Sequence, residues 1–300
     1  MTKRFLLVSI LFLSLQDSFA CDICGCSSGN YFIGPFPVFH RYFVGTRYTF
    51  RSFRSVVAGD PSQFSKDFYQ TAELWGGWNI SKRWQVLGFI PYNFNRQNSD
   101  DGLTKSNGLG DITLILNYNL LNKQAKDKGG NIINQQLWVG AGLKIPTGKF
   151  SPDPNDIIPT ASNQAGSGSV DYIANAMYSI YIKNWGVSSG INYKVNRAAE
   201  GYRFGDRLSA NAFAFRSFTS GTTVFNPNVG VLYEKLEANK LNGEKVPDSG
   251  GNALLASAGL EVGFKKLSVG FNMQLPVSQN FSNEQTTAKL RGMVHVTFTL

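Results

Sequence analysis

Apolar and polar side chains alternate, residue by residue, along much of this chain. Between Asp111 and Leu120, apolar side chains occupy every second position and mostly polar ones lie between them. The same period recurs in residues 254–264, 267–275 and 290–300. Because successive side chains of a β-strand point to opposite faces, this pattern predicts strands with one apolar face. The longest strongly apolar run, Phe5–Leu15, is much shorter than the roughly 20 residues that a membrane-spanning helix needs.

Segments of this kind can be counted along the chain. They lie near residues 43–53, 69–80, 84–94, 110–121, 136–147, 169–183, 185–196, 207–218, 222–235, 252–265, 266–277 and 287–300. An even number of strands with apolar outward faces is typical of an outer-membrane barrel. We therefore expect an all-β fold, a single antiparallel transmembrane β-barrel of about 12 strands that occupies residues 43–300. A soluble periplasmic β-sandwich is the weaker alternative. It would show the same alternation, because the polar face of its strands would simply meet water.

The links between the segments provide an independent test of a barrel, because such barrels alternate short periplasmic turns with longer outside loops. Short links are expected at 79–83, 184, 219–221 and 265–266, and longer polar links at 54–67, 95–107, 148–168, 197–206, 236–251 and 278–286. The link 122–135 is long where a short one is expected. Four tryptophans lie beside the presumed periplasmic turns, where an aromatic girdle would meet the lipid headgroups: Trp78, Trp84, Trp138 and Trp185.

The polar faces of the predicted strands carry charged groups that would line the lumen. The predicted lumen-facing residues are Arg47, Glu73, Asp111, Lys144, Asp171, Lys194, Glu261, Arg291 and His295, with Arg51, Lys183, Glu234 and Lys289 on the same faces. In a barrel of this size, these groups would pair across a narrow interior and leave a slight positive excess. The expected channel is small or plugged rather than wide.

The N-terminus has the layout of a secretory signal peptide. Lys3 and Arg4 precede the apolar run, and Ser18 and Ala20 are the small residues that precede a cleavage site. We expect residues 1–20 to be removed and residues 21–42 to form a periplasmic segment that contains the cysteines. Cys21 at the cleavage site allows a second interpretation, in which the cysteine is lipidated, although Phe19 and Ser18 depart from the usual lipidation signal. Either way, the chain is predicted to be exported to the outer membrane.

Three segments resemble, in order, the hallmark segments of a known family. They are Gly108-Leu-Gly-Asp-Ile-Thr-Leu-Ile-Leu-Asn-Tyr118, Leu143-Lys-Ile-Pro-Thr-Gly148 and Gly166-Ser-Gly-Ser-Val-Asp-Tyr172. The family is the group of outer-membrane barrels named for the meta-pathway of phenol degradation, and residues 24–27 and 43–48 look like its version in Bacteroidota. The resemblance implies a barrel that passes small organic compounds. Its motifs specify turns and register more than chemistry, since Pro146 cannot donate to a ladder and the glycines permit bends.

The cysteines Cys21, Cys24 and Cys26 are the only three in the chain and lie within six positions. In the oxidising periplasm, three cysteines cannot all pair within one chain. One interpretation is a copper or zinc site, because closely spaced thiolates suit these metals and His40 could add a nitrogen ligand. The alternative is a disulfide between two of them, with the third lipidated or free. No other cofactor is expected.

Catalysis and nucleic-acid binding find little support in the sequence. The only histidines are His40, which precedes the first strand, and His295, which is predicted to face inward and away from any lipid ester. The net charge is +9, but the basic residues are scattered among acidic ones and form no patch for nucleic acid. We therefore expect a non-enzymatic barrel for passage or binding of a small organic solute, whose other partners are outer-membrane lipid and the barrel-assembly machinery. A metal-handling or structural barrel without transport, acting through its cysteine segment, is the alternative function.

Overall fold

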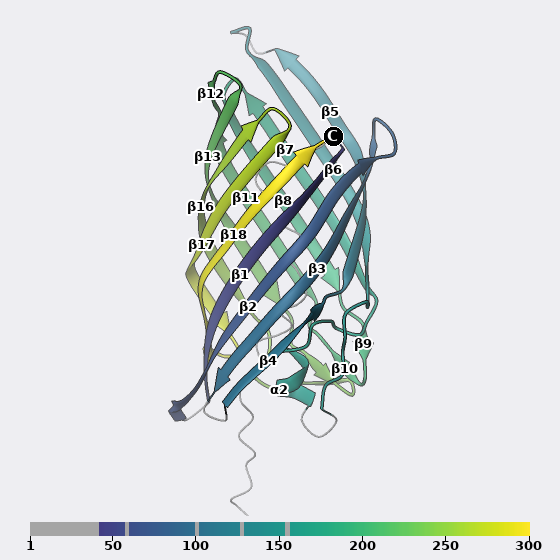
Figure 1. Cartoon of the computed structure of the whole chain (residues 1–300), viewed down its shortest axis with the longest axis vertical. Coiled ribbons are helices and arrows are strands. Elements are labelled where there is room, and N and C mark those ends of the chain that lie inside the picture. The colour runs from purple at the N-terminus through teal and green to yellow at the C-terminus, as the bar shows by residue number, and fades with distance from the viewer. Residues whose placement is uncertain (1–41, 58–59, 100–101, 127–128, 154–156) are drawn as a thin grey trace, which may run out of the picture.

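The computed structural model describes residues 42–57, 60–99, 102–126, 129–153 and 157–300. Its strands form one antiparallel sheet that closes on itself as a barrel (Figure 1). The wall has 12 strands in the order β11-β8-β7-β6-β5-β3-β2-β1-β18-β17-β16-β13, and pairing of β11 with β13 completes the circle. The predicted all-β antiparallel barrel is confirmed. Within the described residues, no helix has the length and apolarity needed to span a membrane.

Each predicted segment corresponds to one strand of the wall. The wall strands are β1 (Phe43–Val57), β2 (Asp60–Asn79), β3 (Trp84–Ser99), β5 (Ile112–Lys126), β6 (Ile132–Ile145), β7 (Asp171–Ile182), β8 (Trp185–Val195), β11 (Arg207–Arg216), β13 (Thr223–Leu236), β16 (Gly251–Phe264), β17 (Leu267–Phe281) and β18 (Thr286–Thr299). Two short strands, β4 (Gly102–Leu109) and β12 (Phe218–Ser220), pair with β3 and β13 and extend the paths of β5 and β11. A small separate sheet holds β9 (Ala198–Ala199), β10 (Tyr202–Arg203), β14 (Lys240–Leu241) and β15 (Glu244–Lys245), and the helix α2 spans Ile157–Ala161.

The alternation of the sequence becomes an outer apolar surface and an inner lining. In β5, Leu114 and Leu116 are exposed, whereas Thr113, Ile115 and Asn117, which alternate with them, are buried. A buried side chain on a closed, single-layer wall faces the barrel interior. The exposed large apolar residues, which occur on every wall strand except β11, therefore form the lipid-facing band of a transmembrane barrel.

The connections divide between the two ends of the barrel (Figure 1). The turn end carries the short connections 80–83, 183–184 and 265–266 together with the C-terminus, and the loop end carries the long links 146–170, 196–206 and 237–250. The link 122–135, expected to be long, is in fact short, because β5 continues to Lys126 and β6 begins at Ile132. The expected loops 54–67, 95–107 and 278–286 are likewise mostly extended strand. Sequence alternation fades there because both faces of the ladder are polar, while the backbone pairing continues.

Three of the four predicted girdle tryptophans lie on the outer surface near the turn end. Trp78, Trp84 and Trp185 are 62%, 41% and 58% exposed. Trp138 is buried in the interior, so its placement in the girdle was wrong. The reason is parity, because Trp138 lies six residues before Lys144 on β6 and therefore shares its inward face.

Two lysines predicted to face the lumen lie elsewhere. Lys289 is exposed because the β1–β18 register shifts between the pairs Arg51–Arg291 and Phe53–Ala288, so β18 has an extra residue in a β-bulge and the alternation changes phase. Lys183 is exposed in the tight turn between β7 and β8, where its φ of 53° lies in the left-handed region. Both predictions were wrong for the same reason, since strict alternation fails wherever a bulge or a turn interrupts the ladder.

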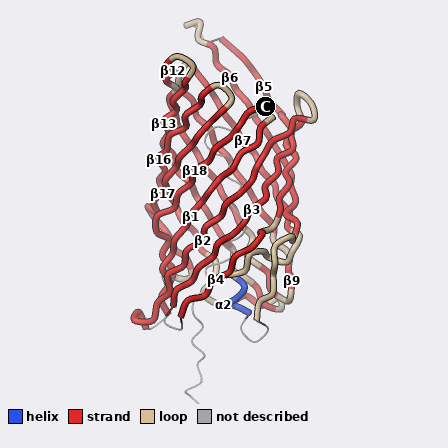
Figure 2. The backbone as a smooth tube through the Cα atoms, in the orientation of Figure 1, coloured by secondary structure: helices blue, strands red, loops and turns tan. Residues whose placement is uncertain are grey.

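Most of the buried apolar residues of the described chain fall into three clusters. Two line the barrel interior: one contains Phe43, Trp75, Leu87, Phe89, Ile115 and Ile173, with Met177 packed against it, and the other contains Phe53, Tyr69, Phe213, Leu232, Leu236, Ala253, Leu255, Phe281 and Ala288. The third lies among the long links of the loop end and includes Ala161, Tyr202, Phe204 and Val246. Figure 2 shows these links and α2 gathered at that end of the barrel. The long links therefore form a packed cap with its own core.

Candidate functional site

The first group of inward polar residues lies where β4 ends and β5 begins. Pro91 on β3 has no backbone N–H to donate, and the ladder of β3 passes from β5 to β4 at this point. The Gly110 amide donates to the Pro91 carbonyl at 2.8 Å, and both Gly110 and Asp111 are buried. This break lets two adjacent residues face inward, and it directs the Asp111 carboxylate into the barrel.

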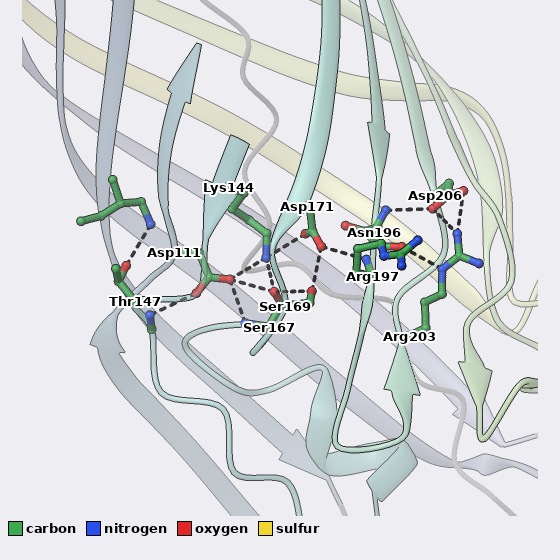
Figure 3. Close-up of polar contacts among 12 residues, drawn as sticks. Asp111, Lys144, Thr147, Ser167, Ser169, Asp171, Asn196, Arg197, Arg203 and Asp206 are labelled. Carbon is green, nitrogen blue, oxygen red and sulfur yellow. Dashed lines mark hydrogen bonds and ion pairs between the residues drawn. The ribbon is translucent and has the colours of Figure 1, made fainter. Parts of the chain in front are cut away.

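Lys144 on β6 links Asp111 to Asp171 at the start of β7 (Figure 3). Its Nζ lies 2.7 Å from Asp111 Oδ2 and 2.8 Å from Asp171 Oδ2, and it also donates to the Ser167 hydroxyl. The three charged side chains are 6% exposed or less. One ammonium thus neutralises part of the charge of two carboxylates in a site largely removed from water.

Both carboxylates accept further hydrogen bonds from the long links. Asp111 accepts from the Ser167 amide at 2.9 Å and the Ser167 hydroxyl at 2.8 Å, and from the Gly148 amide at 3.1 Å. Asp171 accepts from the Ser169 hydroxyl at 2.7 Å and the Arg197 amide at 3.0 Å. The ion-pair cluster therefore holds the long link 146–170 and the start of the link 196–206 to the wall.

The backbone of the link 146–170 makes an unusually close contact with itself. A Cβ on Gly148 would lie 2.7 Å from the Gly166 Cα, and one on Gly166 would meet the Gly148 carbonyl at 2.5 Å. Thr147 donates to the Gly110 carbonyl at 2.9 Å and accepts from the Ile112 amide at 3.0 Å. These contacts explain the glycine–threonine pattern of the two motifs, because only glycine fits where the two backbones touch.

The same link lies against the interior wall as well as at its rim. Asn93 Nδ2 on β3 donates to the Ala165 carbonyl at 2.7 Å, and Asn95 Nδ2 donates to the Asn163 and Gln164 carbonyls at 3.3 and 3.2 Å. Residues 161–163 and 165–167 are buried. The link is thus fixed to inward-facing side chains of β3, β6 and β7 and to Asp111 just before β5, and it narrows the interior at the loop end.

Beyond this cluster, Arg203 and Asp206 form a bidentate ion pair at the rim. The Arg203 Nη2 lies 2.9 and 3.0 Å from the two Asp206 oxygens, and Asp206 also accepts from the Asn196 amide at 2.9 Å (Figure 3). Arg203 donates in addition to the Asn196 carbonyl at 2.8 Å. This pair fixes the link 196–206 beside the ion-pair cluster.

A second charged group lies nearer the turn end. Arg47 on β1 pairs with Glu73 on β2, and His295 Nε2 on β18 lies 2.9 Å from Glu261 Oε2 on β16. The His295 side chain passes over Gly270 on β17 to reach Glu261. It can do so because Gly270 has no side chain, since a Cβ there would lie 2.0 Å from His295 Nε2. The Arg47 guanidinium lies 5.4 Å from the centre of the Trp75 ring. We call Glu261, Gly270, His295, Arg47 and Glu73 the turn-side row, since they are paired in register across neighbouring strands.

A third group lies between the other two. Arg291 Nη1 on β18 donates to Glu234 Oε2 on β13 at 2.9 Å, and the guanidinium lies 5.6 Å from the centre of the Phe53 ring. Both charged side chains are buried. The two strands β16 and β17 separate this pair in the wall, so the contact spans part of the interior.

The structure buries all nine of the principal predicted lumen residues: Arg47, Glu73, Asp111, Lys144, Asp171, Lys194, Glu261, Arg291 and His295. It brings eight of them into the three groups described above. Lys194 on β8 is 2% exposed, and within the described part of the chain its Nζ has no hydrogen-bond partner. Sequence reasoning missed Trp75, Asn93, Ser167 and Ser169. Ser167 and Ser169 lie in the third motif. They precede Asp171 at every second position, and this spacing, which places three side chains on one face of a strand, was the available signal.

The predicted metal ligands cannot be placed in the same way. Cys21, Cys24, Cys26 and His40 lie outside the described residues, as do the predicted signal peptide and most of the 21–42 segment. Among the residues that are described, no three histidine, aspartate or glutamate side chains group in a way that could hold a metal ion. The copper or zinc site therefore stays a prediction.

Comparison with known proteins agrees with this architecture. A family model described as "Putative MetA-pathway of phenol degradation" matches residues 52–291, well over half of the chain. None of the curated protein sequences matches. Among solved structures, an outer membrane channel from Pseudomonas putida F1 is similar with a TM-score of 0.62 and 14% identity, over 91% of this chain and 99% of that one.

Two other solved barrels are less similar. The β-domain of the Bordetella autotransporter BrkA has a TM-score of 0.48 and 11% identity, over 87% of this chain and 100% of that one. The CymD monoaromatic hydrocarbon channel has a TM-score of 0.41 and 11% identity, over 87% of this chain and 88% of that one. At these identities, the likeness concerns the fold alone.

Proposed function

The chain belongs to the family described as "Putative MetA-pathway of phenol degradation", and from this premise we propose that it is an outer-membrane barrel for passive passage or binding of a small organic solute, including hydrophobic and aromatic ones. The proposed role is not enzymatic. The solved barrel from Pseudomonas putida F1 is described as an outer membrane channel, which agrees with passage.

The observation that carries the proposal is the mixed lining of the interior. Trp75 and Phe89 stack at 6.4 Å between ring centres with an interplanar angle of 15°, and the Arg47 guanidinium lies over both rings. Ile115 and Ile173 belong to the same buried cluster. Aromatic faces beside a few oriented polar groups are typical of sites for small organic ligands. A water-filled general porin would need a more uniformly polar lining.

The cap at the loop end supports a selective rather than a wide passage. The link 146–170 is tied to the inner wall by Asn93, Asn95 and the Asp111–Lys144–Asp171 cluster. Barrels of about 16–18 strands leave an aqueous channel, whereas about eight strands leave a filled interior. A 12-strand barrel narrowed by an inward link fits a solute of about the size of one ring.

Planar-bilayer recordings with the purified protein test this proposal. We expect a small conductance that a monoaromatic solute such as phenol blocks in a concentration-dependent way. Replacing Trp75 by alanine should weaken the block, and replacing the outward-facing Trp78 should not. A barrel that is electrically silent and binds no solute would contradict the proposal.

The alternative, a metal-handling or structural barrel, depends on the cysteine segment. Deletion of Cys21–Cys26 separates the two functions, because a solute channel should still conduct, whereas a metal-handling protein should lose bound copper or zinc. Export through a signal peptide is part of the proposal, and mass spectrometry of the mature chain tests it. We expect an N-terminus at Cys21, and its mass also reports whether this cysteine is lipidated.

A further inference from the structure

Lys194 is a buried basic residue on the inward face of β8. Its relative exposure is 2%, and its Nζ has no hydrogen-bond partner among the described residues. Its backbone partner on β11 is Arg207, which is also buried and has Glu234 within electrostatic range. An ammonium that is buried without a partner carries a desolvation cost. The position of Lys194 therefore points to an anionic ligand that would pair with its Nζ.

The nearby carboxylates are already engaged by other groups. Asp111 and Asp171 pair with Lys144 at 2.7 and 2.8 Å and accept hydrogen bonds from the long links. Within the described part of the chain, neither carboxylate is within hydrogen-bond distance of the Lys194 Nζ.

An apolar surface begins directly beside Lys194. Its backbone partner on β7 is Ile173, and both side chains are buried on the inward face. Ile173 belongs to the cluster that includes Phe89 and Trp75, with Met177 packed against it. Cross-strand neighbours have Cβ atoms about 4.5–5.5 Å apart, so a ligand that reaches Lys194 also touches this apolar surface.

We propose that Lys194 binds the carboxylate of an organic acid whose apolar part lies along Ile173 and the aromatic cluster. This inference rests on the proposed function and specifies its solute class as amphipathic organic anions rather than uncharged aromatics. A carboxylate can accept a charge-assisted hydrogen bond from the ammonium, which makes Lys194 a suitable receptor.

Calorimetric titration of the purified full chain with benzoate and with benzyl alcohol tests the proposal, because the two probes share a ring and differ in charge. We expect benzoate to bind at least about tenfold more tightly than benzyl alcohol, as one charge-assisted hydrogen bond requires. Lys194→Met and Lys194→Gln should each weaken benzoate binding about tenfold or more and leave benzyl alcohol unchanged. Lys194→Arg should retain most of the affinity, and Lys183→Met, at an exposed lysine of the turn end, should have no effect. Heat-modifiable migration identifies the variants that fold.

Two results would overturn the inference while leaving the proposed function intact. One is equal affinity of the unmodified barrel for benzoate and benzyl alcohol, together with passage of either solute in bilayers. The other is unchanged benzoate binding in both folded, uncharged Lys194 variants. A barrel that neither binds nor passes any of the solutes would instead contradict the proposed function itself.

Discussion

Replacement of Lys144 by methionine removes the shared cation of a buried cluster and should destabilise the barrel strongly. Methionine keeps most of the length of the lysine side chain but has no charge. Asp111 and Asp171, which lie 2.7 and 2.8 Å from the ammonium, would then lose the cation that both contact. Their mutual repulsion adds to the cost of keeping them away from water.

The loss of unfolding free energy depends on the hydrogen bonds that each carboxylate retains in the variant. Removing one partner of a buried ion pair costs about 3–5 kcal/mol in typical cases. Asp111 keeps hydrogen bonds from the Ser167 amide, the Ser167 hydroxyl and the Gly148 amide, and Asp171 keeps those from Ser169 and Arg197. These bonds stabilise the charged forms, so we expect a loss near the lower limit, about 3 kcal/mol of unfolding free energy. The double variant with Asp111→Asn should recover part of this loss, because only one carboxylate then stays charged.

Urea unfolding of the refolded barrel in detergent micelles measures the change through the midpoint and slope of the transition. Lys235→Met is the matched control, since Lys235 pairs with Glu237 at 2.8 Å but both side chains are at least half exposed. Limited proteolysis gives a second measurement, because the link 146–170 should be cleaved faster once its attachment to the wall weakens. Equal effects of Lys144→Met and Lys235→Met, or protection of the link in the Lys144 variant, would refute the reasoning.

Three further predictions concern single positions of the wall. Gly270→Ala should separate the histidine–carboxylate pair above it and cost about 1–3 kcal/mol, whereas Gly263→Ala, with its nearest atom 4.0 Å away, should be tolerated in the same urea assay. Trp138→Ala should cost about 3–5 kcal/mol because it empties a fully buried site, and a loss below 1 kcal/mol would contradict its inward position. Lys289→Cys, at an exposed position, should react with a water-soluble maleimide faster than Arg291→Cys, at a buried one; the reverse result would place the β18 bulge elsewhere.

The strands could be predicted from the sequence because a lipid-facing wall imposes the same alternation wherever it meets the bilayer. The pattern of β5, with Leu114 and Leu116 outside and Thr113 inside, is visible in the printed sequence and in the structure alike. The pattern fails where the ladder is irregular. The bulge beside Lys289 depends on the register of β1 against β18, two strands from opposite ends of the chain. No local window contains that information.

The interior contacts were harder to predict than the wall. Alternation places Asp111, Lys144 and Asp171 on inward faces, but only the folded barrel shows that one lysine serves both carboxylates. The inward path of the link 146–170 depends on Asn93 and on the contact between Gly148 and Gly166, which are distant in sequence. The motifs contained these residues without indicating that they meet. Polar loops are compatible with many paths until long-range hydrogen bonds select one.

The pairing of β1 with β18 has a consequence for how the molecule is made. All other neighbouring strands of the wall are close in the order of the chain, but this seam joins Phe43 to Thr299. It can form only after the last residues have been synthesised and delivered, so assembly necessarily passes through an open sheet with β1 and β18 as two bare edges. Such edges pair readily with other chains. Assembly of this barrel therefore requires that the unfinished sheet be shielded until its first and last strands meet.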